Sequence, residues 1–347
     1  MEDGSRSEEL PHRQHLLLLA AIHEFITTAQ PVGSHQLAMK HPLGIRAAMV
    51  RNLMSELEES GFLMQPHTSA GRVPTEQAFR YFVDHLIPTA IQFQDRTQIE
   101  LHYSAPAADL NGVIRDTSRL LALMTGQAAL VTTPRLDSLK VEHVSFVRLR
   151  EREVLTIFVV AAGASQSRVV STGQDYGQAD LDRMSAYLNE SLGGLTLRQM
   201  REWIERQLNL ERATYDQFMR SALVLGGAIA NNPVPAEIYV EGSSTALDQP
   251  EFADPSRTRE LLRALDDKTA LLDLLERTLK QSGLTVLIGS ENLDARLAGL
   301  SVVTAAYASG SNPLGSLAVV GPVRMDYERV IPLVGYTARA LSRALEH

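Results

Sequence analysis

The chain has 347 residues, of which 44% are hydrophobic and 21% are charged, and its net charge at pH 7 is −8. At roughly 150 residues per domain this length predicts two or three domains, and the acidic balance excludes a protein that coats nucleic acid through overall positive charge. Cysteine is absent, which excludes disulfides, thiolate zinc sites and a cysteine nucleophile.

The sequence contains no pattern typical of secretion or of a membrane span. The apolar run from Leu16 to Ile22 has neither a basic flank nor a small-residue cleavage site, so it is interpreted as a core helix. The most apolar strand-like stretch, from Val154 to Ala164, is far shorter than the roughly 20 residues that cross a bilayer. We therefore expect a cytoplasmic protein without a membrane partner.

Three helices are predicted near the start of the chain. Apolar residues recur at helical spacing over residues 14–28 and 46–60. Between them, Ser34 stands where the N-cap of a short helix ending near Lys40 is expected. Gly61 follows the third helix in the position of a C-terminal stop.

A β-hairpin is predicted next. Residues 62–65 and 72–74 have the composition of two short strands, and the turn between them includes Gly71, which we expect to adopt a positive φ. Thr75 then caps a further helix. The order of three helices followed by a hairpin is typical of a winged helix-turn-helix, which we assign to residues 1–90.

The third helix has a face suited to reading DNA bases. The residues predicted on that face are Ala47, Ala48, Arg51, Asn52 and Ser55. Small residues permit close approach, the guanidinium of Arg51 can bond guanine O6 and N7, and the amide of Asn52 can bond adenine N6 and N7. In an isolated helix such a face is more often simply solvated, but the preceding helix and the following hairpin favour insertion into a major groove.

The hairpin supplies groups for the DNA backbone or a minor groove, namely His67, Thr68, Ser69 and Arg72. A polar tip without a function is the alternative, and the prolines that stiffen both flanks favour contact. Residues 1–90 contain seven Lys or Arg and ten Asp or Glu, so binding must depend on local placement. The cations expected near the DNA are Lys40, Arg46, Arg51, Arg72 and Arg80.

Strands and helices alternate in blocks through the rest of the chain. Strands are predicted over residues 128–133, 139–150, 153–162, 167–172, 237–240, 284–289, 301–307 and 317–321. Helices are predicted over residues 180–192, 196–225, 256–281 and 332–345. This order predicts an antiparallel α+β domain, residues 91–194 and 282–347, interrupted by a mostly helical insertion, residues 195–281.

Catalytic signatures are scarce. The sequence has neither H-E-x-x-H nor G-x-S-x-G, and although Gly310 and Gly315 have the spacing of a P-loop, Ser316 replaces the required lysine. The segment Ser290–Asn292 can either line a pocket at a strand end or form a structural turn. We expect a protein that is not an enzyme and that has neither a cofactor nor a metal ion.

Several motifs together resemble the family of the heat-inducible transcription repressor HrcA. They are Pro31–Ser34, Arg51–Asn52, Leu57–Gly61, Pro66–Thr75, Ile288–Asn292 and Gly321–Tyr327, so the resemblance covers nearly the whole chain. It implies a homodimeric repressor that binds double-stranded DNA at an inverted-repeat operator, the CIRCE element, upstream of chaperone genes. It also implies that the chaperonin GroEL promotes the active repressor, and that the α+β domain is GAF-like and carries an inserted dimerising domain.

The reading helix departs from the family pattern at its start. Arg46-Ala47-Ala48 stands where the family usually has serine or threonine. A lost N-cap costs ~1 kcal/mol, and hydroxyl contacts to DNA are lost while Arg46 adds a cation. The residues expected to contact DNA are Ser34, Arg46, Ala47, Ala48, Arg51, Asn52, Ser55, His67, Thr68, Ser69 and Arg72.

Two alternatives to this repressor remain open. A metabolite-sensing regulator would use a GAF-like pocket with polar groups around Glu291, and an enzyme with an appended DNA-binding domain would show perturbed titratable pairs there. A filled core at that place favours the repressor. The subunits of the repressor are expected to pair through the insertion. If the dimer is only marginally stable, heating reduces the amount of dimer and repression is lifted. The candidate dimer contacts are Leu208, Leu210, Phe218, Leu223, Val224, Leu225 and Ile229.

Overall fold

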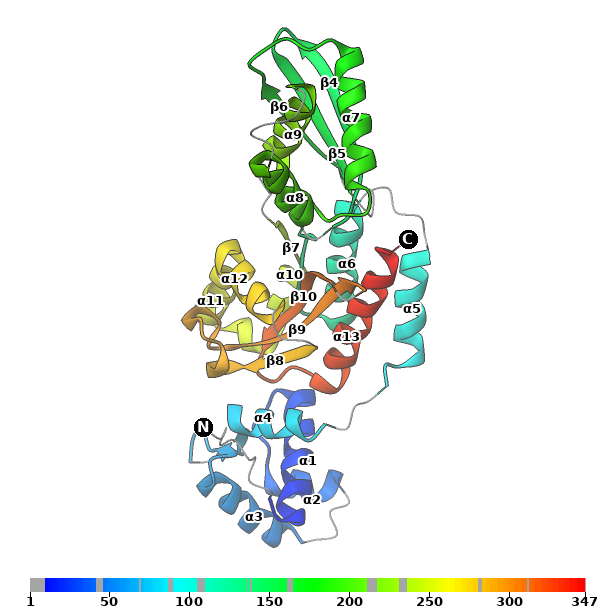
Figure 1. Ribbon diagram of the computed structural model, residues 1–347. Helices are drawn as coiled ribbons and strands as arrows, with labels where there is room; N and C mark the ends of the chain where they lie inside the picture. The colour runs from blue at the N-terminus through cyan, green and yellow to red at the C-terminus, as the bar shows by residue number, and fades with distance from the viewer. Residues whose placement is uncertain are drawn as a thin grey trace.

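A computed structural model of the chain has an elongated shape, with three parts arranged end to end (Figure 1). The residues that the structure describes are 10–41, 46–68, 70–86, 90–104, 110–135, 137, 139–160, 165–210, 217–230, 236–279, 283–310 and 312–346. A helical part with a hairpin lies at one end, a five-stranded sheet with its helices lies in the middle, and a three-stranded sheet with its helices lies at the other end.

The N-terminal part consists of four helices and a short hairpin. Its elements are α1 (His12–Thr28), α2 (Ser34–Lys40), α3 (Ala47–Glu59), β1 (Leu63–Met64), β2 (Val73–Pro74) and α4 (Glu76–Asp84). The apolar stripe of α1 packs against α3 and α4, which buries Leu17, Ile22 and Phe82. The order agrees with the sequence prediction, except that Ser34 is not the N-cap. Gly33 already has the extended backbone of a cap, and α2 begins at Ser34 itself.

The middle part is built on an antiparallel sheet with the strand order β7-β3-β10-β9-β8. Its strands are β3 (Ala128–Thr132), β7 (Ile238–Glu241), β8 (Leu284–Ile288), β9 (Leu300–Ser309) and β10 (Asn312–Pro322). Successive side chains of a strand point to opposite faces. In β10, Val319 therefore enters one apolar core, whereas Ala318 and Val320 enter another.

Helices cover both faces of this sheet, which explains why every residue of β3 is buried. One face carries α6 (Leu110–Thr125) and α13 (Tyr327–Ala344), with α5 (Phe93–Ser104) outside them. The other face carries α10 (Ser243–Leu247), η3 (Pro250–Ala253), α11 (Pro255–Asp266) and α12 (Lys268–Leu279). Two short 3₁₀ turns, η4 (Gly289–Glu291) and η5 (Ala295–Leu297), connect β8 to β9. Within the described ranges, no helix is both long and apolar enough to span a bilayer.

The third part is inserted between β3 and β7, which are neighbours in the middle sheet. Its elements are β4 (Val141–Arg150), β5 (Glu153–Val160), β6 (Ser165–Ser171), α7 (Gln178–Leu192), α8 (Leu197–Leu210) and α9 (Gln217–Ala230). The sheet has the order β4-β5-β6, and α7 and α9 pack on it. Every second residue of β5 is buried and the others are half-exposed, as expected for a sheet that is covered on one face.

The observed packing differs from the predicted division of the chain. The strands over residues 141–171 form a sheet of their own in the insertion, although the sequence analysis assigns them to the α+β domain. Conversely, α11 and α12 bury Leu261 and Leu275 on the middle sheet, although the analysis places them in the insertion. Strand pairing is non-local, so the composition of a strand does not reveal which sheet it joins. The middle part itself is consistent with a GAF-like α+β domain.

Some helix boundaries also differ from prediction. The predicted helix over residues 256–281 is interrupted at Asp267, which has non-helical ψ, and the predicted helix over residues 196–225 corresponds to α8 and α9. The last helix begins before Pro332, because the Asp326 side chain caps it by accepting a hydrogen bond from the N–H of Arg329. The helices α5 and α6 were not predicted.

Candidate nucleic-acid interface

The outer face of α3 lies at the free end of the N-terminal part (Figure 1). Its inner face buries Val50, Met54 and Leu57. The residues exposed on the outer face or just before the helix are Arg46, Ala48, Arg51 and Asn52, and Ala47 and Ser55 are partly exposed. Among the described residues, no hydrogen-bond or ion-pair partner engages the side chains of Arg46, Arg51 or Asn52. They are available to a ligand.

The start of α3 is open. Arg46 is the N-cap residue with extended backbone, and among the described residues no side chain accepts a hydrogen bond from the first N–H groups of the helix. The hydroxyl cap whose loss was expected from Arg46-Ala47-Ala48 is therefore missing. An uncapped helix N-terminus presents N–H groups and a partial positive charge, both of which favour phosphate.

Arg72 has a different position from the one expected. Its Nε donates to Glu58 Oε2 at 2.7 Å and its Nη2 donates to Ser55 Oγ at 2.9 Å, and only 16% of its side chain is exposed. Arg72 and Ser55 thus bond to each other and hold the hairpin against α3. Glu58 draws Arg72 away from a free contact with phosphate, and no motif in the sequence indicates this pairing.

The tip of the hairpin exposes His67 and Thr68, and Ser69 lies outside the described residues. The turn is braced by Gln65, whose Nε2 donates to the carbonyl oxygens of Thr68 (3.1 Å) and Ala70 (2.9 Å). This bracing residue also escaped the sequence analysis.

Gly71 does not adopt the positive φ that was expected of it. Its need for glycine has another cause, because a Cβ at this position would lie 2.5 Å from the carbonyl oxygen of Val32. Val32 and Arg72 exchange two backbone hydrogen bonds there, at 2.8 and 2.9 Å. The hairpin is therefore held closely against the loop between α1 and α2.

Two of the cations expected near DNA have partners inside the protein. The Nζ of Lys40 lies 2.6 Å from Oε1 of Glu24, a buried carboxylate, and this hydrogen bond is the main cause that lowers the pKa of Glu24. Arg80 faces the middle part and pairs with Glu291. Tertiary packing brings both partners close. It turns Arg80 away from the DNA-reading face, whereas Lys40 stays more than half exposed and its expected place near DNA remains a prediction.

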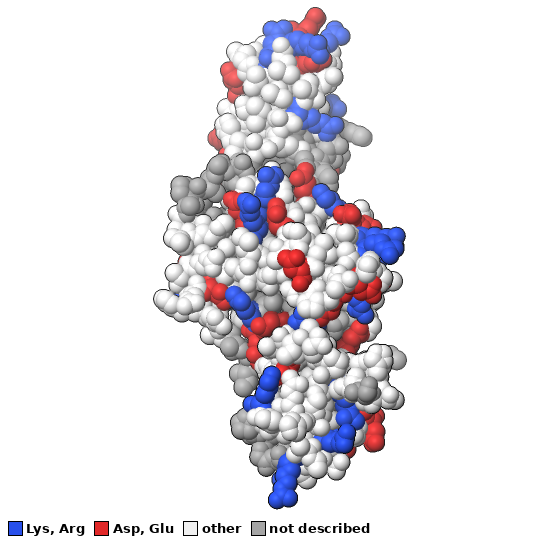
Figure 2. Space-filling model, turned by 180° about the vertical axis from the view of Figure 1, so that it is seen from behind, with Lys and Arg blue, Asp and Glu red and all other residues white. Residues whose placement is uncertain are grey.

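Charge is distributed unevenly along α3. The exposed cations Arg46 and Arg51 lie at its first two turns, whereas the exposed carboxylates Glu56 and Glu59 lie near its end. Figure 2 shows the reverse side of the molecule, where Lys and Arg side chains project from the end formed by the N-terminal part. This distribution favours approach to a polyanion with the start of α3 leading.

The place considered for a GAF-like ligand pocket lies around Glu291, where the structure has a pocket of about 560 Å³ lined by Glu291, Asp294 and Arg296 among others. Beside it, apolar side chains of α11, α12 and the sheet, among them Leu261, Leu275 and Ala318, pack into one buried core. Glu291 lies outside this core and pairs with Arg80. Within the described part of the chain, no group of three or more His, Asp or Glu side chains is arranged to hold a metal ion.

Most of the expected dimer contacts belong to the insertion's own core. Leu223 and Leu225 are buried, and Leu208 and Phe218 are partly buried against the same core. Val224 is 53% exposed. The side chains of Leu210 and Ile229 fall outside the described part of the structure.

Comparison with known proteins identifies relatives over nearly the whole chain. A family model described as the HrcA protein C terminal domain matches residues 111–331. The protein named heat-inducible transcription repressor HrcA from Geobacter sulfurreducens (strain ATCC 51573 / DSM 12127 / PCA) is 41% identical over 339 residues, which cover 97% of this chain and 99% of that protein. Proteins of the same name from Syntrophobacter fumaroxidans (strain DSM 10017 / MPOB) and Anaeromyxobacter sp. (strain K) are 35% and 38% identical, over 97% and 98% of this chain and 98% and 97% of those proteins.

A solved structure is similar in fold. It is the crystal structure of a hypothetical protein at 2.2 Å resolution, with 25% sequence identity and a TM-score of 0.62. The match covers 97% of this chain and 98% of that chain. The similarity therefore extends through all three parts of the molecule.

Proposed function

Because the chain belongs to the HrcA family of heat-inducible transcription repressors, we propose that it represses heat-shock (chaperone) genes by binding an inverted-repeat operator, the CIRCE element, as a homodimer. The observation that carries this proposal is the outer face of α3. Arg51 and Asn52 are exposed on this face and have no partner among the described residues, and α3 lies at the free end of the molecule. A regulator of this family is not an enzyme.

In this proposal the N-terminal part is a winged helix-turn-helix, with α2 and α3 as its helix pair and the hairpin as its wing. Arg51 and Asn52 contact base edges in the major groove, and Ala47 and Ala48 permit close approach. Arg46 and the exposed N–H groups at the start of α3 bind phosphate, as do His67 and Thr68 on the wing. Arg72 orients the wing through Ser55 and Glu58.

The dimer interface that we propose is the open face of the three-stranded sheet. Val147 pairs with Leu155, and Leu155 pairs with Val169, so three apolar side chains lie side by side across the strands. Val169 and Leu149 are each 50% exposed. An apolar sheet face of this kind is stabilised when a second copy covers it.

A face-to-face dimer is also supported by the way the β4 edge is closed. The Asn189 side chain forms two hydrogen bonds with the backbone of Val144, at 2.8 and 2.9 Å. Ser185 Oγ accepts from the N–H of Phe146 at 3.0 Å, and Gln178 Oε1 accepts from the N–H of Arg148 at 2.9 Å. Side chains of α7 thus occupy the groups that a strand from another chain would need.

We propose further that the chaperonin GroEL promotes the active repressor. Chains that have lost their partner expose the apolar sheet face, and exposed apolar surface is prone to aggregation. During heat stress, other unfolded proteins occupy the chaperonin, so fewer repressor chains are returned to active dimers. Repression is then lifted. The protein is expected to act in the cytoplasm, together with its DNA and its chaperonin.

The test is a gel-shift titration on a duplex that contains the CIRCE inverted repeat, with and without GroEL and ATP. The proposal predicts a sequence-specific complex whose active fraction increases with the chaperonin. Equal binding to the inverted repeat and to a scrambled duplex would contradict DNA recognition. An unchanged active fraction would contradict only the role of the chaperonin.

A further inference from the structure

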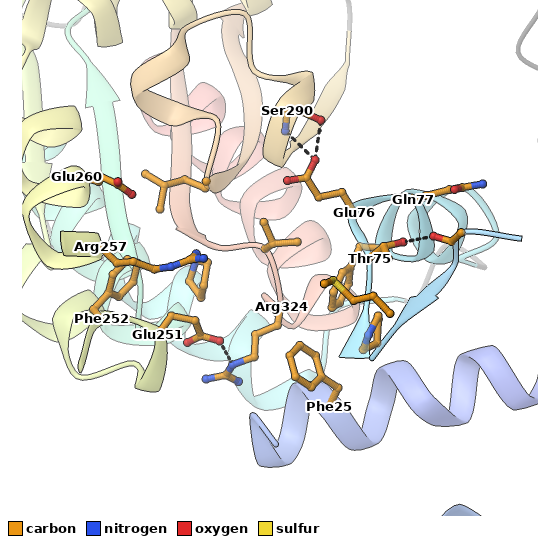
Figure 3. Close-up of a pocket in the computed structure, with 18 of the residues that line it drawn as sticks. Phe25, Thr75, Glu76, Gln77, Glu251, Phe252, Arg257, Glu260, Ser290 and Arg324 are labelled. Carbon is orange, nitrogen blue, oxygen red and sulfur yellow. Dashed lines mark hydrogen bonds and ion pairs between the residues drawn. The ribbon is translucent and has the colours of Figure 1, made fainter. Parts of the chain in front are cut away.

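Two motifs singled out in the sequence, Ile288–Asn292 and Gly321–Tyr327, lie far from the DNA-reading face. Both lie instead against the N-terminal part, at a cleft of about 710 Å³ between it and the middle part (Figure 3). The charged groups that line this cleft largely bond across the boundary or to neighbouring side chains. The cleft is therefore a place where the two parts are held together.

The residues from Gly289 to Asn292, in and directly after the turn η4, each have a separate structural role. Ser290 donates to Glu76 Oε2 of α4 from both its N–H (2.9 Å) and its Oγ (2.6 Å). Gly289, with φ +53°, leaves the space that this carboxylate occupies, since a Cβ there would lie 2.0 Å from Glu76 Oε1. Asn292 is buried and donates to three carbonyl oxygens, which fixes the turn.

Glu291 completes the contact one helical turn further along α4. Its Oε1 accepts a hydrogen bond from Arg80 Nε at 2.7 Å, and its Oε2 accepts one from Arg80 Nη2. The same Nη2 also donates to the carbonyl oxygen of Val286 at 2.7 Å. A two-pronged guanidinium–carboxylate pair fixes direction as well as distance. We call the four residues Glu76, Arg80, Ser290 and Glu291 the docking contact.

The second motif holds α1 at the same boundary. Arg324, only 10% exposed, donates from Nη1 to the carbonyl oxygen of Ile26 at 2.6 Å and is itself held by Glu251 and by Gln249. A guanidinium at the last turn of a helix satisfies a free carbonyl and matches the helix dipole. Orientation of the N-terminal part is thus fixed at both α4 and α1.

We propose that the docking contact sets which spacing between operator half-sites the dimer accepts. This inference depends on the proposed function. In a dimer that pairs through the insertion, the reading helices lie at the far ends of two elongated chains, so a small rotation at the boundary displaces them substantially. Half-sites recur at about 34–36 Å along DNA, and a fixed boundary makes the dimer selective for one spacing.

The test is a charge exchange. Arg80→Glu places two carboxylates face to face, Glu291→Arg places two guanidinium groups face to face, and the double variant restores an opposite-charge pair. Asp84→Asn is the matched control, because it removes the other ion pair of Arg80, which lies within α4 and does not cross the boundary. Each variant is titrated on duplexes whose half-sites are identical and whose spacer changes by single base pairs.

Each single variant is expected to reduce the preference for the best spacer over its neighbours by about tenfold, within the range typical of coupling between sites. The double variant is expected to recover most of that preference, and the Asp84 variant is expected to keep it. Variants that keep the wild-type spacer preference would overturn the inference, as would a double variant that recovers nothing.

A readout without DNA separates this inference from the proposed function. The chain has no cysteine, so spin labels can be attached at Met39→Cys and Leu123→Cys, two exposed positions in the N-terminal and middle parts. One narrow distance is expected for the wild type and the double variant, and a broad distribution for each single variant. Unchanged distances in the single variants would overturn the inference, whereas a wild type that binds no inverted repeat would overturn the proposed function.

Discussion

Arg51 and Arg72 are both arginines of the N-terminal part, but their surroundings assign them different roles. Arg51 is exposed on α3 and has no partner among the described residues. Arg72 is held between Glu58 and Ser55. The first is placed to contact a ligand and the second to hold the hairpin in place, and substitution separates the two roles.

Replacing Arg51 with alanine is expected to weaken operator binding by about 1–3 kcal/mol and to relax the preference for one base. Thermal stability is expected to stay unchanged, because the side chain is exposed and unpaired. Fluorescence anisotropy at low salt measures the affinity, and Arg119→Ala, at another exposed arginine in the middle part, is the control. Wild-type affinity in the Arg51 variant would contradict the assignment of α3 as the reading helix.

Replacing Arg72 with alanine is expected to lower the stability of the N-terminal part by about 1–3 kcal/mol, since hydrogen bonds to a charged group are lost. Calorimetry measures this loss. Lysine at position 72 should recover little of this stability, because its single ammonium group does not have the two separate guanidinium nitrogens that donate to Glu58 and to Ser55. A melting temperature equal to that of the Arg51 variant would show that the pairing contributes nothing.

Residue types at the interface could be predicted from the sequence, and their partners could not. The exposure of Arg51 and Asn52 follows from helical periodicity. By contrast, the partner of Arg80 lies 211 positions away in the chain, and Lys40 turns toward Glu24 only because α2 packs on α1. Periodicity within one helix contains no information about such contacts.

At the scale of elements, the sequence predicts boundaries well where the signal is local. Thr75 caps α4 by accepting a hydrogen bond from the N–H of Ala78, and Gly61 follows α3 with φ +80°. Prediction fails where tertiary packing decides, as at Asp267, where one predicted helix becomes two. The hairpin is an example of both, because its two strands are predicted from the sequence, whereas the close contact that requires glycine at position 71 is not.

The close contact at Gly71 provides a test at this scale. Gly71→Ala is expected to displace the hairpin from Val32 and to destabilise the N-terminal part by about 1–3 kcal/mol, the usual range for inserting a group where no space exists. The matched control is Gly33→Ala, because nothing lies within 4 Å of a Cβ at that position. Chemical denaturation of both variants gives the comparison, and equal stabilities would contradict the account of Gly71.

At the scale of the whole molecule, the sequence predicts the α+β class and the presence of an insertion, but it assigns the wrong segments to the insertion. The strands β4, β5 and β6 have the same composition as those of the middle sheet, and their pairing is decided by neighbours in space. The exposed apolar face that results could not be seen before the strands were assembled. We therefore propose dimer contacts on this sheet face instead of on the helices expected from the sequence.

A charge in the middle of that face tests the dimer. Ile157 pairs with Ser145 and Ser167 on the open face, and Ile157→Glu is expected to weaken dimerisation by about 2 kcal/mol or more, as for a central interface residue. Sedimentation equilibrium measures the dissociation constant. Leu293→Glu, at a residue that is 85% exposed in the middle part, is the control. Equal dimerisation in both variants would refute the sheet-face interface.

We propose that two chains together read two half-sites through α3. The most direct measurement is the stoichiometry and affinity of the purified protein on a CIRCE duplex and on the same duplex with one half-site scrambled, in rising salt. We predict two chains per intact duplex, an affinity at least about tenfold lower for the scrambled one, and weaker binding as salt increases. A single bound chain, or equal affinity for both duplexes, would contradict the account.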